Sequence, residues 1–354
     1  MLNSLQAAFI RDELMTAKNP LFIHDDDPDG LCSFLLLYRQ RKEGKGAILN
    51  SAPKLDERFL RKVEEVNPDK IFVLDIPIVE QEFIDKVNRP IFWLDHHQPL
   101  ERHNIHYFNP RIKDPHAYYP TTAMAYQITQ NPEDLWIAMV GCLADWYLPN
   151  FVEQFKEKYP DLLQETGDLT KLVYHQPIGQ LVKLFFFILK GPTQDVRKSI
   201  KILTRIQSPE EITKQETAQG KFLWKRFKQI NHHYEILLKE AKKQVNRSNI
   251  LLFFYLDNQW SFTPNLANEL TSLYPKKVIV IGRKKSGSVK CSLRAQFPIL
   301  ESVEKALIGI EGYGGGHYNA CGAVVKEDDW DRFFDNFKRE LKSIEKEEAK
   351  EQTT

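Results

Sequence analysis

The sequence has few cysteines, almost no net charge and no long apolar run. Its four cysteines never form a Cys-x-x-Cys pair, so we expect reduced, mostly buried thiols of a cytoplasmic protein rather than a disulfide framework. Lys and Arg total 49 against 48 Asp and Glu, which argues against indiscriminate binding of long nucleic-acid duplexes. The most apolar run, residues 181–189, is too short to span a bilayer, and residues 1–15 lack the apolar core of a signal peptide. These absences predict a folded cytoplasmic protein without a membrane segment.

The 354 residues are enough for two domains, and their pattern predicts an α/β protein. Residues 1 to about 150 alternate short apolar strands with helical stretches, which is typical of a doubly wound parallel sheet. A smaller α/β pattern follows a polar stretch near residue 246. We expect an N-terminal domain over 1–208, of which 151–208 is a helical extension, a connector helix over 209–246, a C-terminal domain over 247–345 and a charged tail over 346–354.

An acidic turn follows the first apolar strand, which we predict over residues 20–23. Four carboxylates occupy the five positions from Asp25 to Asp29, and a helix is predicted from about Leu31, with Gly30 in the turn between them. Crowded carboxylates repel each other. Such a cluster is tolerated either around a multivalent cation or as a solvated acidic loop. A strand-to-helix turn of this kind lies at the edge of an α/β sheet where ligands bind.

Two further apolar strands end in the same kind of residue. The strand predicted over 71–74 runs into Asp75, and the strand predicted over 91–94 runs into Asp95-His96-His97. Taken singly, each acidic residue could simply cap the following helix. Because the carboxyl ends of parallel strands share one edge, three such ends together favour a common metal centre.

Two predicted helices add to this edge. The apolar helix over 135–143 leads to Asp145, a carboxylate that needs either a metal or a structural hydrogen bond if it is buried. The hydroxyls of Thr121 and Thr122 are suited to cap a helix over 123–129, and the same helix N-terminus could hold a phosphate.

The C-terminal half contains a glycine-rich run, Gly312 to His317. Consecutive glycines let backbone amides approach an anion closely, although a plain flexible loop has the same composition. Arg294 on a predicted neighbouring strand, with His317, adds side chains suited to a phosphate. The basic residues at 283–285 are typical of an ordinary solvated turn.

Together these motifs resemble the DHH phosphoesterase superfamily. The acidic run from Asp25 to Gly30, then Asp75, the Asp95-His96-His97 triplet and Asp145 follow the order of its four motifs. Arg294 and the glycine run resemble its C-terminal substrate-binding domain, DHHA1. Asp25 matches the first acidic position of the RecJ-like form, whereas the oligoribonuclease branch places a histidine slightly earlier. His24 stands beside Asp25, so which of the two binds metal stays open.

The resemblance implies a site for two metal ions, usually Mn²⁺, with Mg²⁺ as a substitute. Asp27 and Asp29 would each hold one ion and Asp75 would bridge them. Carboxylate and imidazole ligands without a thiolate suit Mn²⁺. By position, the implied metal ligands are Asp25, Asp27, Asp29, Asp75, His96 and Asp145, the catalytic residues Asp29, Asp75 and His97, and the substrate-binding residues His97, Arg294, Gly314, Gly315, Gly316 and His317.

The function implied is that of a manganese-dependent phosphodiesterase that releases mononucleotides from an end of single-stranded or short DNA or RNA. The alternatives are a cyclic dinucleotide phosphodiesterase and a catalytically silent replication or repair scaffold. Every expected ligand position is filled, which argues against the silent scaffold. The sequence leaves open a homodimer and a replication or repair partner protein.

Overall fold

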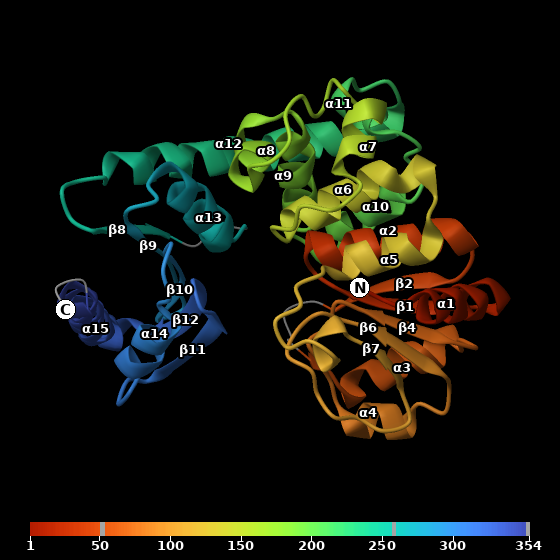
Figure 1. Ribbon diagram of the computed structural model, residues 1–354, viewed down its shortest axis with the longest axis horizontal. Helices are drawn as coiled ribbons and strands as arrows, with labels where there is room; N and C mark the ends of the chain where they lie inside the picture. The colour runs from red at the N-terminus through yellow and green to blue at the C-terminus, as the bar shows by residue number, and fades with distance from the viewer. Residues whose placement is uncertain (50–53, 257–259, 352–354) are drawn as a thin grey trace. The chain divides into compact units, whose positions relative to one another are not determined.

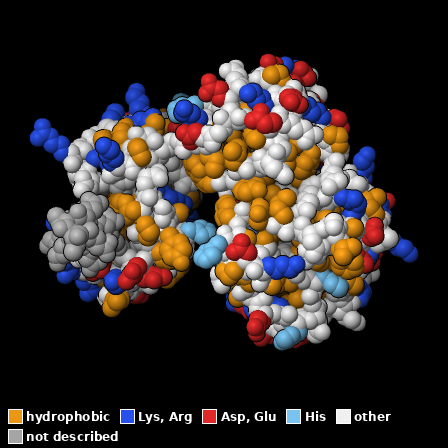
Figure 2. Space-filling model, in the orientation of Figure 1, with side chains coloured by type: hydrophobic (Ala, Val, Ile, Leu, Met, Phe, Trp, Pro, Cys, Tyr) orange, Lys and Arg blue, Asp and Glu red, His pale blue; other side chains and the backbone are white. Residues whose placement is uncertain are grey.

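The computed structural model describes residues 1–49, 54–256 and 260–351. The chain forms two compact units, residues 1–227 and 228–354 (Figure 1). In the described part of the chain no helix is both long and apolar enough to cross a membrane. Basic and acidic side chains are scattered over the face of the N-terminal unit shown in Figure 2, without a large patch of one sign.

The N-terminal unit is built on a parallel sheet. Its five strands lie in the order β2-β1-β4-β6-β7, each parallel to its neighbour, as the doubly wound prediction requires. The chain goes from β1 out to the edge at β2 and then returns to the other side of β1 at β4. This reversal places the ligand-binding crevice of such a sheet at the carboxyl ends of β1 and β4. The strands are β1 Leu21–Asp25, β2 Lys45–Leu49, β4 Ile71–Leu74, β6 Ile91–Leu94 and β7 His106–Phe108.

The inner strands β1, β4 and β6 are buried on both faces, because helices cover the sheet on two sides (Figure 1). The edge strands β2 and β7 are partly exposed. On one face Phe22, Phe72 and Phe92 stack in register, with ring centroids 5.4 and 5.1 Å apart. On the other, alternate residues such as Ile23 and Val73 pack with α3 and α4. The first face is covered by α1 Ser4–Thr16, α2 Pro28–Arg41 and α5 Thr121–Thr129, and α6 Leu135–Ala144 packs on α2 and α5. The second face is covered by α3 Leu60–Val66 and α4 Gln81–Lys86.

Short elements complete this sheet region. Two parallel two-residue strands, β3 and β5, form a separate small sheet. These elements are β3 Lys54–Leu55, β5 Ile78–Val79, η1 Glu57–Phe59, η2 Pro110–Ile112 and η3 Pro132–Asp134.

The region after residue 150 is helical, as predicted, but the connector is not one helix. A loop over residues 214–217 separates two helices, and the Thr217 hydroxyl donates to Glu211 across it. Glu211 also accepts the backbone amides of Gln207 and Ser208, which precede the first of these helices. Gln215 in that loop has a φ of 56°. Local side-chain bonds of this kind compete with helix continuation. The helices are α7 Val152–Lys158, α8 Leu169–His175, α9 Ile178–Ile188, α10 Thr193–Leu203, α11 Pro209–Thr213 and α12 Ala218–Lys243.

The C-terminal unit has a mixed five-stranded sheet in the order β11-β12-β10-β9-β8, in which only β8 and β9 pair in parallel. Val303, Phe333 and Phe337 of α14 and α15 are buried with one face of this sheet. Its elements are β8 Ile250–Leu256, α13 Thr263–Leu273, β9 Val278–Lys285, β10 Ser288–Arg294, α14 Leu300–Ala306, β11 Gly312–His317, β12 Ala320–Lys326, η4 Glu327–Asp329 and α15 Trp330–Glu351.

The glycine-rich run is therefore an edge strand rather than a flexible loop. Gly312 to His317 pairs antiparallel with β12 along its whole length, because the hairpin brings β12 alongside it. Glycines weaken a strand but allow close approach of another group, so their position at an edge is meaningful.

Candidate metal centre

The predicted strand ends meet at the crevice between β1 and β4. Asp25 is the last residue of β1, and Asp75 follows β4 directly. Asp75 has a φ of 61°, in the left-handed region that non-glycine residues adopt rarely and that clusters at functional sites. Its amide donates to the Leu94 carbonyl (2.9 Å), which ties this turn to the end of β6.

Asp27 begins helix α2 as its N-cap. One of its carboxylate oxygens accepts the amide of Gly30 at 2.9 Å. From the sequence we expected Gly30 in the turn between the strand and the helix. In the structure Gly30 lies in the first turn of α2 instead. A side chain on Gly30 would meet the Asp25 backbone at 2.8 Å, so glycine is needed here for close packing.

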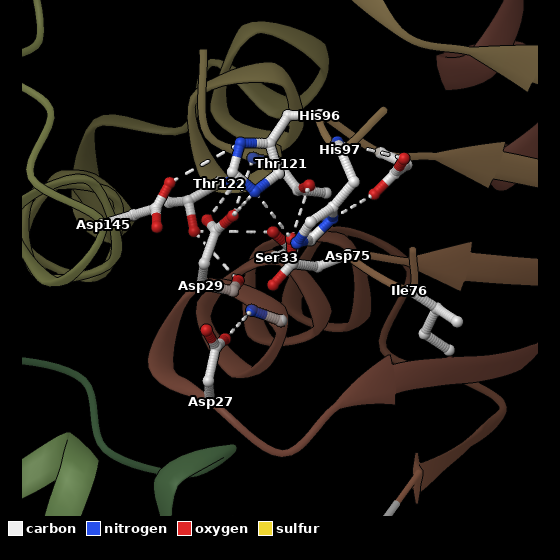
Figure 3. A network of polar contacts seen from close by, with 12 residues as sticks. Asp27, Asp29, Ser33, Asp75, Ile76, His96, His97, Thr121, Thr122 and Asp145 are labelled. Carbon is white, nitrogen blue, oxygen red and sulfur yellow. Dashed lines mark hydrogen bonds and ion pairs between the residues drawn. The ribbon is translucent and has the colours of Figure 1, made fainter. Parts of the chain in front are cut away.

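Asp29 is held by the N-terminus of α5 (Figure 3). Its two carboxylate oxygens accept the amides of Thr121 (2.9 Å) and Thr122 (2.8 Å). We expected the threonine hydroxyls to cap these amides, or a phosphate to bind them. They bind the Asp29 carboxylate instead, and the helix dipole favours its negative charge. The Thr121 hydroxyl instead donates to Asp75 (3.2 Å).

His96 lies between the two sides of the cluster. Its Nε2 is 3.3 Å from an Asp75 oxygen and 3.9 Å from Asp29, and its Nδ1 is 3.6 Å from Asp145. The structure brings all six predicted ligands together. The sets of ligand atoms that lie within 4.8 Å of one another are Asp25, Asp27 and Asp75; Asp29, His96 and Asp145; and Asp75, His96 and His97.

The electrostatics of this cluster fit a divalent cation. Burial and the charge of Asp27 raise the pKa of Asp25 to about 8, and burial with neighbouring carboxylates raises that of Asp27 to about 6. The same causes raise the pKa values of Asp75 and Asp145 well above the ordinary range. A bound cation would favour the charged forms, and the oxygen and imidazole donors are those that divalent cations use.

Another buried acidic residue shows the contrast. Asp134 is only 1% exposed, but Arg39 lies 2.5 Å from its carboxylate and also bonds the Ile206 carbonyl. This carboxylate has its cation within the protein, whereas the carboxylates of the cluster face one another.

Asp95 orients His97, a role that the sequence did not assign to it. Its fully buried carboxylate accepts from His97 Nδ1 (2.7 Å), from the Tyr107 hydroxyl (3.2 Å) and from the Asn109 amide (3.1 Å). Burial opposes the charge of His97, but the hydrogen bond and charge of Asp95 outweigh it and raise the His97 pKa. The bond to Nδ1 leaves Nε2 for a ligand or a phosphate.

The two histidines do not diverge as alternating strand residues would. Both lie beyond the end of β6, and their ring centroids are 4.5 Å apart. His24, by contrast, belongs to β1 itself and stacks on Phe34 at 5.0 Å, and it is not in any of the ligand sets. The geometry therefore favours Asp25 over His24 as a ligand.

Tyr118 is a further residue of this site that no sequence motif indicated. Its hydroxyl donates to the Asp145 carboxylate (2.9 Å) and lies 2.6 Å from the Asp145 carbonyl, and its ring meets the His96 ring edge-on at 5.7 Å. It is 44% exposed, so it stands at the mouth of the cluster. Only the fold brings it to Asp145, 27 positions away.

The C-terminal unit has a pocket of its own, of about 360 Å³. Lys290, Ser292 and Arg294 line it from alternate positions of β10. Between the two cations the sheet carries small residues, because Gly322 of β12 and Gly315 of β11 lie in register with Ser292. The glycines therefore form a hollow floor between Lys290 and Arg294.

Arg294 is held in place by neutral groups. Its Nε donates to Asn268 (2.7 Å), and Nη1 donates to the carbonyls of Leu293 (2.9 Å) and Cys321 (3.0 Å). Of the other predicted substrate residues, Gly314 and Gly315 line the pocket. Gly316 and His317 end β11, and the described lining does not include them.

Comparisons with known proteins agree with this architecture. Residues 249–343 match the family model of the DHHA1 domain. No curated protein sequence matches the chain.

Among solved structures, exonuclease RecJ bound to manganese aligns over 95% of this chain and 94% of its own, at a TM-score of 0.64 and 14% identity. RecJ from Thermus thermophilus in complex with Mn²⁺ aligns over 96% of this chain and 54% of its own (TM-score 0.65, 15% identity). A pGpG-specific phosphodiesterase, PggH from Vibrio cholerae, aligns over 92% and 99% (TM-score 0.50, 15% identity). At such identities these likenesses concern the fold.

Proposed function

We propose that the chain is a member of the DHH/DHHA1 phosphoesterase superfamily and a metal-dependent phosphodiesterase that releases mononucleotides from an end of short or single-stranded oligonucleotides. The DHHA1 match and the RecJ-like fold support this proposal. The observation that supports it most is the pair of ligand sets, Asp25–Asp27–Asp75 and Asp29–His96–Asp145, which His96 links through its 3.3 Å contact with Asp75.

Two Mn²⁺ ions, with Mg²⁺ as a substitute, are the cofactors we propose. When bound, they would supply a nucleophile from water at neutral pH and stabilise both the attacking and the leaving oxygens of an in-line displacement. The protein's own part is to hold the ligands rigidly. The carboxylate of Asp29 accepts two backbone amides of α5, and the backbone amide of Asp75 donates a hydrogen bond to the Leu94 carbonyl.

His97 is proposed to face the scissile phosphate. Asp95 accepts from its Nδ1 and sets the orientation of the ring, so that the opposite nitrogen can donate to a phosphate oxygen. A donor aimed at developing negative charge stabilises the transition state more than the ground state.

The pocket of the C-terminal unit is proposed to hold a phosphate of the substrate that is not cleaved. Arg294 is pre-oriented by Asn268, and the glycine floor leaves room between Arg294 and Lys290. Charge-assisted contacts to such a phosphate would select an oligonucleotide over a simple phosphodiester.

The test is hydrolysis of end-labelled oligonucleotides of graded length, DNA and RNA in parallel, with Mn²⁺, with Mg²⁺ and with chelator. We expect mononucleotide products that appear one at a time with Mn²⁺ and less efficiently with Mg²⁺. Full activity in chelator, or cleavage only within the strand, would contradict the proposal.

A dinucleotide phosphodiesterase is the second candidate, since the fold is shared with the pGpG-specific phosphodiesterase. Linear and cyclic dinucleotides in the same assay separate the two. Hydrolysis confined to dinucleotides would replace the exonuclease by this narrower activity.

A further inference from the structure

The N-terminal unit has a second cavity that the metal centre does not use. It has a volume of about 540 Å³ and lies along the edge strand β2, between residues of η1 and α3 and residues of α10. That volume is typical of sites for small ligands. No carboxylate and none of the proposed metal ligands is among its described lining residues.

Five cations line this cavity, and they come from four elements, β2, η1, α3 and α10. Arg58 and Lys62 already pair with Asp56 (2.8 Å) and Glu65 (3.4 Å). The remaining three form no ion pair within the described residues; these are Lys45 of β2 and Arg197 and Lys201 of α10. Exposed cations around one cavity attract an anion.

Two of these cations share a helix face. Arg197 and Lys201 are four residues apart on α10, with Ile200 and Thr204 beside them in the same lining. This face of α10 therefore presents both charged and apolar side chains to the cavity.

The other lining is aromatic and apolar. His24 and Phe34 are buried and stack on each other, and Tyr38 and Phe59 are half-buried beside them. Gly46 belongs to the same wall, where a side chain would meet the Phe34 ring at 2.6 Å. Since β2 is an edge strand, one row of its backbone donors and acceptors pairs with no strand among the described residues.

A ligand for this cavity must combine negative charge with a flat apolar body that can accept hydrogen bonds. We propose that it binds a phosphorylated nucleoside unit, with its phosphate at Lys45, Arg197 and Lys201 and its base against Tyr38 and Phe59. The unit comes either from a free nucleotide or from a single strand. Aromatic rings beside a cationic rim are the usual means of holding such units. None of the proposed metal ligands lines this site, so binding there needs no metal.

The experiment measures binding to the full chain in chelator, where no hydrolysis can occur. The probes are a free mononucleotide, followed by calorimetry, and a labelled 12-residue single strand, followed by fluorescence anisotropy over a series of salt concentrations. The variant is Lys45→Glu/Lys201→Glu. The matched control is Lys171→Glu/Lys221→Glu, which makes the same charge change at exposed positions of the same unit.

We expect the cavity variant to bind at least one probe roughly tenfold more weakly, and the control to bind as the parent does. If the strand is the ligand, the slope of log Kd against log salt should fall by about 1.4, for two lost phosphate contacts. Loss with the mononucleotide alone identifies a free nucleotide as the ligand. Lys45→Gln/Lys201→Gln should give a smaller loss in the same direction.

Equal binding by the cavity variant and the parent, or equal weakening in the control, would overturn the proposal. Hydrolysis of bis(p-nitrophenyl) phosphate with Mn²⁺ should be unchanged in the cavity variant, which shows that the unit is folded. A parent that binds through this cavity but hydrolyses nothing would refute the proposed function and leave the cavity site standing.

Discussion

The two units of this protein present charge in opposite ways. In the N-terminal unit, side chains at the ends of parallel strands converge, so carboxylates from distant parts of the sequence are buried against one another. In the C-terminal unit, side chains stand on the face of antiparallel strands. There Arg294 donates to neutral acceptors, the Asn268 side chain and the carbonyls of Leu293 and Cys321, and it lines one pocket together with Lys290.

This difference indicates what each unit requires. Like charges that are buried together are unfavourable until an opposite charge joins them, so the first site favours a cation. Two cations, Lys290 and Arg294, line the pocket of the C-terminal unit, so the second site favours an anion. A divalent cation would meet the requirement of the first site and a phosphate that of the second, and the two can be tested separately.

Asp75→Asn should produce the largest effect. Removing a charge shared by two ligand sets should reduce phosphodiester hydrolysis by roughly a hundred- to a thousandfold or more. Asn tolerates the left-handed backbone at this position, and loss of a repelling charge should not lower the melting temperature in chelator. Turnover within about tenfold of the parent would show that Asp75 is not a shared ligand.

Asp134→Asn is the matched control for that variant. It also removes a buried carboxylate, but one that is paired with Arg39. Breaking that pair should lower the melting temperature, while the folded protein keeps its activity. The opposite outcomes of the two substitutions would separate a metal ligand from a structural ion pair.

The two histidines should differ in metal content. His96→Ala should lose metal, because His96 contacts carboxylates on both sides of the cluster. His97→Ala should keep the metal and lose rate, because His97 is held by Asp95 and is 30% exposed. Elemental analysis and single-turnover rates decide between these roles, and the same metal loss in both variants would make His97 a ligand.

Arg294→Ala should have a smaller effect that depends on the substrate. We expect kcat/KM on a dinucleotide to fall roughly ten- to a hundredfold, since charge-assisted contacts are worth about 1.5–3 kcal/mol. Hydrolysis of bis(p-nitrophenyl) phosphate should be almost unchanged, because that substrate has no second phosphate. Equal loss on both substrates would mean that Arg294 supports the fold or the metal centre.

The smallest effect should be a pH dependence of stability without metal. The folded pKa values of about 8 for Asp25 and about 6 for Asp27 lie above the unfolded value of about 3.9. The folded protein therefore binds more protons than the unfolded chain, and its free energy of unfolding falls as pH rises from about 4 to about 8.

In chelator we expect the melting temperature to fall by several degrees between pH 5 and pH 8. Saturating Mn²⁺ should remove most of this decline, because the carboxylates are then charged throughout the range. Parallel curves with and without metal would show that the cluster is not where the ions bind.

Local sequence was enough to predict which strand and helix ends form the metal centre. Four-residue apolar runs that end in Asp75 and at Asp95 are typical of buried parallel strands, and such strands bring their carboxyl ends to one edge. The apolar helix that leads to Asp145 was predictable for the same reason, because its composition indicates burial along its whole length.

What surrounds those residues was decided by the tertiary structure. The amides that hold Asp29 lie 92 and 93 positions further along the chain, and the bond of Tyr118 to Asp145 spans 27. The glycine run became a strand only because β12 pairs with it, and the cavity beside β2 exists only because α10 packs near it. A periodic pattern reports which face of an element is buried. It carries no information on which distant donor, ring or strand will meet that face, because those contacts arise only when the elements pack.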